Sequence, residues 1–185
     1  RPRDYVELTR RIIMANTTFS GPVISKNGFI NTGPGMTVSL TADTTLTVAA
    51  HAGKILLTND ADGKFTLPSI NISANGATAG DTDYNNLNNL GATFHFYVET
   101  AATDMDIKTD GTDKFKGGIM VAVDDGGKKA FIPAATNDVI TMNGSTKGGI
   151  VGSVVSFTAI DAITYLVHNS LLLGSGTIVT PYADA

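Results

Sequence analysis

The chain contains no cysteine among its 185 residues. Disulfides, iron–sulfur clusters, thiolate zinc sites and cysteine nucleophiles are therefore excluded, and a small secreted module built on disulfides is disfavoured. A chain of this length buries roughly 70% of the surface that its unfolded form exposes, so folding needs no covalent cross-link. We therefore expect a single core that packing alone holds together.

Long apolar runs are also missing. The longest, Ile119–Val123 and a run around 165–173, stay well below the roughly 20 residues that a membrane helix needs. The first residues are charged and lack a central apolar region, so we expect no signal peptide at this end. These features predict neither a membrane partner nor a targeting signal.

Arginine is absent after residue 11. The four arginines are Arg1, Arg3, Arg10 and Arg11, and every later basic residue is lysine. The formal net charge is −4, and the part that follows the arginines is more acidic still. An acidic body does not favour nucleic-acid binding, which needs a clustered basic face, so no nucleic-acid partner is predicted. Because arginine is favoured in protein interfaces, we predict that these four residues bind a partner protein.

Residues 1–36 are predicted to form an N-terminal arm. Asp4 and Glu7 have the spacing of a capping box, and apolar residues follow at helical spacing, which predicts a short helix near 4–13. In residues 15–36, Gly-Pro and Asn-Gly pairs recur at short intervals and favour an extended chain over a helix.

Residues 1–13 also allow a second interpretation, in which they are not part of the natural protein. Arg10-Arg11 is what the paired AGG codons of a ribosome-binding sequence give when they are translated in frame, and Met14 is then the start. Both origins stay open at this point.

Residues 37–185 are predicted to form one all-β domain. Glycine is abundant (20 residues) and Thr, Asn and Asp are frequent, a mixture that suits short strands joined by tight turns. We expect about ten to twelve short strands, no helix, and a β-sandwich or jelly-roll-like architecture. Residues 71–91, rich in Asn, Gly and Asp, are predicted to be a long surface loop. The expected strands are 38–40, 46–48, 54–58, 64–67, 94–98, 105–107, 119–123, 130–132, 139–142, 150–159, 164–168 and 171–173.

Three histidines are candidates for chemistry: His51, His95 and His168. His95 stands between Phe94 and Phe96, so in a strand it faces away from the two aromatic rings. No histidine has a second His or a Glu at the spacing of a metal site. We interpret all three as structural.

A short acidic segment resembles the middle of a calcium-binding loop. Asp60 and Asp62 precede Gly63, but Thr58 and Ser69 stand where such a loop needs carboxylates. We therefore interpret the segment as a turn between two strands.

The densest acidic cluster consists of Asp104, Asp106, Asp110 and Asp113. In a strand, Asp104 and Asp106 share one face, as a catalytic carboxylate pair of a glycoside hydrolase or two metal ligands do. The same alternation is typical of any half-solvated strand, and the chain has no tryptophan to form a sugar platform. The sequence also lacks phosphate-loop, nucleophile-elbow and dinucleotide motifs. We predict no catalytic, cofactor-binding or metal-binding residue, and hence no enzyme.

Three stretches resemble a known group of proteins. They are Leu46–Ile70 (LTVAAHAGKILLTNDADGKFTLPSI), Gly91–Gly117 (GATFHFYVETAATDMDIKTDGTDKFKG) and the final segment from Leu172 to Ala185. They resemble small virion proteins of tailed bacteriophages, especially phages of marine bacteria and cyanobacteria. The resemblance covers roughly residues 15–185, and residues 1–13 have no counterpart in it.

The resemblance implies a virion structural protein, specifically a capsid decoration (cement) protein on the outer head shell. Such a protein binds the major capsid protein and stabilises contacts between capsid subunits without chemistry. It is expected to be a homo-oligomer, and a trimer would suit a local three-fold axis. A β-sandwich module of a phage tail or receptor-binding fibre, with 71–91 as its exposed loop, is the alternative. An enzyme or sugar-binding lectin built around Asp104 and Asp106 is a third class.

Overall fold

The computed structural model describes residues 33–72, 88–124 and 126–185. The predicted helix near 4–13 and nearly all of the predicted arm lie outside these residues, and so does most of the predicted 71–91 loop. Thr32–Ala185 forms one compact unit. Its described part contains 13 strands, which confirms the predicted all-β class.

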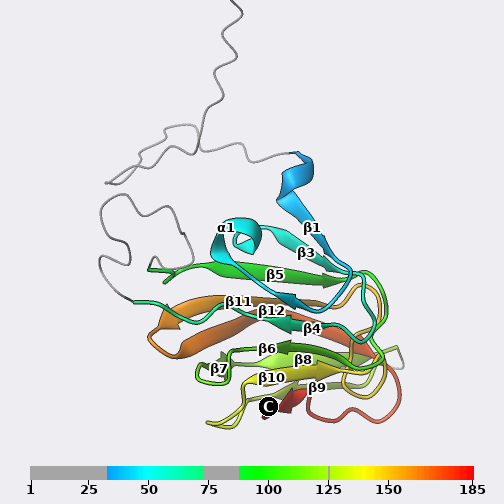
Figure 1. The fold of residues 1–185 in the computed structure, drawn as a ribbon. Helices are drawn as coiled ribbons and strands as arrows, with labels where there is room; N and C mark the ends of the chain where they lie inside the picture. The colour runs from blue at the N-terminus through cyan, green and yellow to red at the C-terminus, as the bar shows by residue number, and fades with distance from the viewer. Residues whose placement is uncertain (1–32, 73–87, 125) are drawn as a thin grey trace, which may run out of the picture. The chain divides into compact units, whose positions relative to one another are not determined.

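The strands form two sheets (Figure 1). Sheet A has eight strands, in the order β1 (Thr37–Leu40), β3 (Ile55–Thr58), β5 (Thr93–Val98), β11 (Val154–Asp161), β12 (Thr164–Gly174), β8 (Ile119–Val123) and β9 (Lys128–Phe131), with β7 (Lys114–Gly117) also paired to β12. Sheet B has five, in the order β13 (Tyr182–Ala183), β10 (Val139–Met142), β6 (Met105–Lys108), β4 (Lys64–Thr66) and β2 (Thr44–Thr45).

The first six strands wind back and forth between the two sheets. β1, β3 and β5 are parallel neighbours in sheet A, and β2, β4 and β6 are parallel neighbours in sheet B. Each strand therefore pairs with the strand two positions along the chain, as in the turns of a β-helix. The register places Val38, Leu56 and Phe96 side by side. The sequence pattern, read as strands separated by turns, did not predict this parallel winding.

The inward-facing side chains of the two sheets share one core. Phe96 of β5 lies 6.2 Å from Phe65 of β4 and 5.7 Å from Phe157 of β11, measured between ring centroids. Phe115 of β7 lies 5.2 Å from Phe157. Burying one such ring stabilises the fold by roughly 1.5–3 kcal/mol, and a well-oriented aromatic pair adds about 0.5–1.5 kcal/mol. Because Phe65 belongs to sheet B and the other rings to sheet A, this cluster joins the sheets.

The prediction of a helix-free body is wrong at one short segment. We expected residues 46–48 in a strand, but Val48–His51 forms a single helical turn, α1. In the predicted arm, Pro34–Met36 forms a 3-10 turn where an extended chain is predicted. Thr47 caps α1, because its hydroxyl accepts the N–H of Ala50 at 3.3 Å. The alanines of α1 favour a helix, and this local preference overrides the apparent strand alternation.

β12 changes partners half-way along its length. Its first half pairs with β7 and its second half with β8. Gly117 ends β7 with φ +104°, and a Cβ there would lie 2.2 Å from the carbonyl oxygen of Val167, so only glycine fits. On the other side of β12, the register with β11 shifts between Val154 and Ser156. Asn169, with φ 45°, is the only described non-glycine residue with a positive φ and marks this bulge.

Candidate functional site on the outer face of sheet A

The predicted acidic pair Asp104 and Asp106 is neutralised by one lysine. Both carboxylates lie 3.0 Å from Nζ of Lys64, so they share one side as predicted. Burial lowers the pKa of Lys64, but the hydrogen bonds and charges of the two carboxylates outweigh it and raise the pKa above its ordinary value. Oδ1 of Asp106 is buried without a hydrogen-bond partner among the described residues. The pair therefore forms an ion-pair cluster on β4 and β6.

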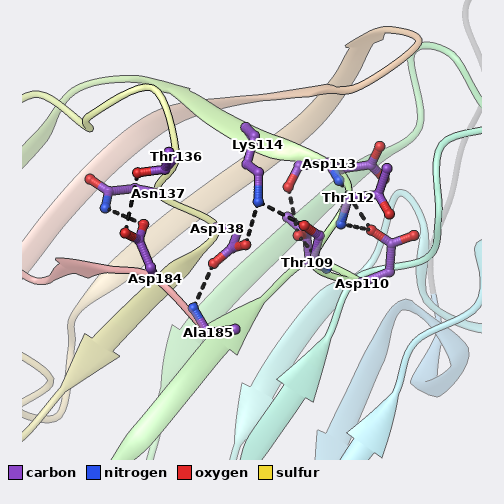
Figure 2. A network of polar contacts seen from close by, with 11 residues as sticks. Thr109, Asp110, Thr112, Asp113, Lys114, Thr136, Asn137, Asp138, Asp184 and Ala185 are labelled. Carbon is purple, nitrogen blue, oxygen red and sulfur yellow. Dashed lines mark hydrogen bonds and ion pairs between the residues drawn. The ribbon is translucent and has the colours of Figure 1, made fainter.

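Asp110 and Asp113 build the turn between β6 and β7 (Figure 2). Oδ1 of Asp110 accepts the backbone N–H groups of Thr112 and Asp113, at 2.9 and 3.1 Å. Oδ2 of Asp113 accepts the N–H of Ile70 at 2.9 Å. Burial raises the pKa of Asp113, whereas hydrogen bonds to Asp110 outweigh its burial and lower its pKa. These carboxylates hold backbone in place.

Beside this turn, a second group of carboxylates fastens the final residues (Figure 2). The buried Asp138 accepts a hydrogen bond from Nζ of Lys114 and, at 2.9 Å, one from the N–H of Ala185. Asp184 accepts a hydrogen bond from Nδ2 of Asn137 at 2.8 Å. This network holds the segment before β10 against Lys114 and the final two residues, so its role is structural.

The Asp60–Gly63 segment is a turn that carries the chain from β3 to β4, as interpreted from the sequence. The carbonyl of Ala61 accepts the N–H of Thr103 at 2.7 Å, which ties the turn to the segment before β6. A hydrogen bond with the Asp62 side chain raises the pKa of Asp60. Among the described residues, no group of three or more His, Cys, Asp or Glu side chains is placed to hold a metal ion.

The structure brings together two of the three histidines. His95 faces away from the buried rings of Phe94 and Phe96, which confirms the sequence prediction. Its Nδ1 lies 2.9 Å from Oγ of Ser156, and Nε2 of His168 lies 2.8 Å from Oγ1 of Thr158. Burial, and then the charge of His95, lower the pKa of His168. The sequence does not reveal this grouping. Only the register of β5, β11 and β12 places the two histidines in one line, on either side of Ser156.

A continuous line of apolar side chains crosses sheet A next to these histidines. We call it the apolar row: it consists of Leu57, Tyr97, Val154, Leu171, Met120 and Ala130, which are paired from strand to strand. Leu171 is 39% exposed and Met120 is 44% exposed. A single exposed apolar residue needs no explanation, but a contiguous row across six strands indicates an interaction surface.

The next line of the same face is the histidine row. It consists of Thr37, Ile55, His95, Ser156 and His168, again in register. Beyond it lie Thr93, Thr158 and Leu166. A shallow hollow of about 380 Å³ opens between the rows at the bulge, lined by Ile55, His95, Tyr97, Val154 and Asn169 among others. We call the apolar row, the histidine row and the three residues beyond it (Thr93, Thr158 and Leu166) the sheet A face.

The sheet A face is almost free of charge. The two rows contain no Asp, Glu, Lys or Arg; Asp161 is exposed at the end of β11, and Lys116 and Lys128 stand on β7 and β9. The outward positions of sheet B, in contrast, include Lys64, Asp106 and Lys108. A sheet face that meets only water is normally polar, as sheet B is. The sheet A face is therefore suited to contact protein, and its uncharged hydroxyls and imidazoles offer hydrogen bonds there.

Comparisons with protein-family models, with curated proteins and with solved structures find no match. The resemblance to phage virion proteins thus stays a prediction from the sequence motifs. None of the helices in the described ranges is both long and apolar enough to span a membrane.

Proposed function

We propose that this chain is a non-enzymatic structural protein of a virion, a capsid decoration protein that binds the major capsid protein on the outer head shell. The observation that carries the proposal is the sheet A face, a broad uncharged surface on a β body. The motifs of Leu46–Ile70 and Gly91–Gly117, which resemble phage virion proteins, indicate which kind of assembly uses it.

A structural role also agrees with how the acidic residues are used. Asp104 and Asp106 share Lys64, while Asp110, Asp113 and Asp138 hold backbone groups. A catalytic carboxylate needs a perturbed environment that faces a cleft and a substrate. These five carboxylates are engaged in ion pairs and turns, and the proposal requires no catalytic or cofactor site.

Decoration stabilises a shell by mass action. A protein that binds the assembled shell and not its dissociated subunits shifts the equilibrium toward the shell by an amount that grows with its free concentration. Copies that associate with one another gain further avidity because several weak contacts act together. An N-terminal arm with Arg1, Arg3, Arg10 and Arg11 adds a further contact to a neighbouring subunit.

The proposal is tested by adding the purified chain to heads of the parent phage that lack it. We expect saturable co-sedimentation with the heads and a higher temperature of head disruption. The matched controls are tails of the same phage and heads already carrying the protein. Binding to tails and not to heads would support the tail or fibre module, and binding to neither would refute a virion role.

A further inference from the structure

We infer that the sheet A face is the surface through which copies of this chain associate with one another. This inference rests on the proposed structural role, in which copies of the chain assemble. It adds which residues form the contact between copies. The occupant of the face is a second copy of this chain.

The size of the face suits such a contact. The apolar row and Ser39 at its end span seven strands, and at about 4.8 Å per strand step this gives a length of roughly 29 Å. Three lines of side chains, each about 6.7 Å apart along the strands, give the face a projected area of about 500 Å². Two copies would then bury about 1,000 Å² together, which reaches the lower limit of specific protein interfaces.

The charge of the face selects the kind of partner. The chain has a net charge of −4 and a pI of about 5.2, so most other surfaces of two copies repel each other. Within the two rows this repulsion is absent, because their residues include no Asp, Glu, Lys or Arg. A strongly charged partner would call for complementary charges, and the central strands do not provide them.

The hydrogen-bonding groups of the face are self-complementary. Ser156, Thr158, Tyr97 and neutral histidines each both donate and accept hydrogen bonds. An interface between identical surfaces needs this property, because each group meets a group from the same set on the other copy. The hollow at the Asn169 bulge gives an apolar side chain of the second copy a place to pack.

The inference is tested by sedimentation equilibrium of the full chain in solution, without heads. We expect the wild-type chain to associate at micromolar concentration, and Leu171→Glu to weaken association at least ~100-fold because an unpaired carboxylate would be buried. Val179→Glu is the matched control, because Val179 is 42% exposed, close to the exposure of Leu171, but lies on the segment before β13 of sheet B, and its substitution should leave association unchanged.

A second variant separates a loss of association from misfolding of the variant protein. Met120→Gln removes apolar surface from the same row without adding charge, and it should weaken association less than Leu171→Glu does. Circular dichroism and thermal melts of each variant confirm the fold. A monomeric wild type at about 100 µM, or equal effects of Leu171→Glu and Val179→Glu, overturns the inference. Head binding by a wild type that stays monomeric would leave the proposed function standing, whereas self-association without head binding would refute only that function.

Discussion

Acid should dissociate the copies that associate through the sheet A face. His168 of β12 faces Ser156 and Thr158 of β11, with His95 of β5 beyond them. Around this face the described strands also carry Tyr97 on β5, Lys116 on β7, Lys128 on β9, and Asp161 near Lys116. No carboxylate lies at the outward positions beside His168 to stabilise its protonated form. Protonation of His168 therefore places like charges on both copies.

The direction and size of this pH dependence follow from the linkage between protonation and association. The pKa of His168 is already below 6.5 because burial and His95 disfavour its charged form, and a second copy buries it further. Association therefore favours the neutral form, is unaffected from about pH 8 to pH 7, and weakens as the pH falls below the pKa of the free chain. Each histidine that releases its proton on association changes the association constant by up to about tenfold per pH unit. With His168 on each of two copies, the loss reaches about 100-fold per pH unit.

Sedimentation equilibrium between pH 7.5 and pH 5 measures this loss. The variant His95→Gln/His168→Gln keeps hydrogen-bonding side chains and should remove most of the pH dependence. His51→Gln is the matched control: burial also lowers the pKa of His51, but His51 lies on α1, outside the sheet A face. Equal pH dependence in the wild type and the double variant would refute the reasoning, and so would loss of the pH dependence in His51→Gln.

Three further outcomes are expected. Phe157→Ala should lower the free energy of unfolding in urea by about 3–5 kcal/mol, because the ring is fully buried between Phe96 and Phe115, and the half-buried Phe131→Ala should cost clearly less. Gly117→Ala should destabilise the fold by more than Gly111→Ala, since both have positive φ but only a Cβ at 117 meets a backbone carbonyl; equal melting temperatures would contradict this. Deleting residues 1–13 should reduce head occupancy and leave the melting temperature of the β body unchanged, and unchanged occupancy would argue against a docking arm.

The all-β class could be predicted because it depends on local patterns. Phe94, Phe96 and Val98 alternate with polar residues, and all three are buried on one side of β5. The Asp-Gly turn after Asn59 was also identified correctly as a connection between strands. Patterns of this kind act over a few residues, and a sequence displays them directly.

The pairing of strands could not be predicted in the same way. An Asp-Gly turn ends a strand, but it does not say whether the next strand returns beside it or crosses to the other sheet. In this chain β3 lies in sheet A and β4 in sheet B. Each pairs in parallel with strands 18 or more residues away in the sequence, as Ile55 of β3 does with Thr37. Such contacts depend on the fit of the whole core, which no single segment encodes.

The sheet A face was missed for the same reason. His95, Ser156 and His168 are separated by long stretches of sequence, and each has an ordinary structural interpretation on its own. Leu171 and Met120 were recognised only as parts of apolar strands. Their significance comes from the register, which lines them up on one side of the sheet, and from the absence of charge between them. The acidic cluster, in contrast, was easy to see in the sequence and proved to be committed to Lys64 and to turns.

Cryo-electron microscopy of the native particle that contains this chain tests the central claim most directly. The account predicts copies on the outer head shell, grouped so that the sheet A face of each copy contacts another copy while the body or arm contacts capsid subunits. Density confined to the tail, or head-bound copies whose sheet A faces are open to solvent, would contradict it.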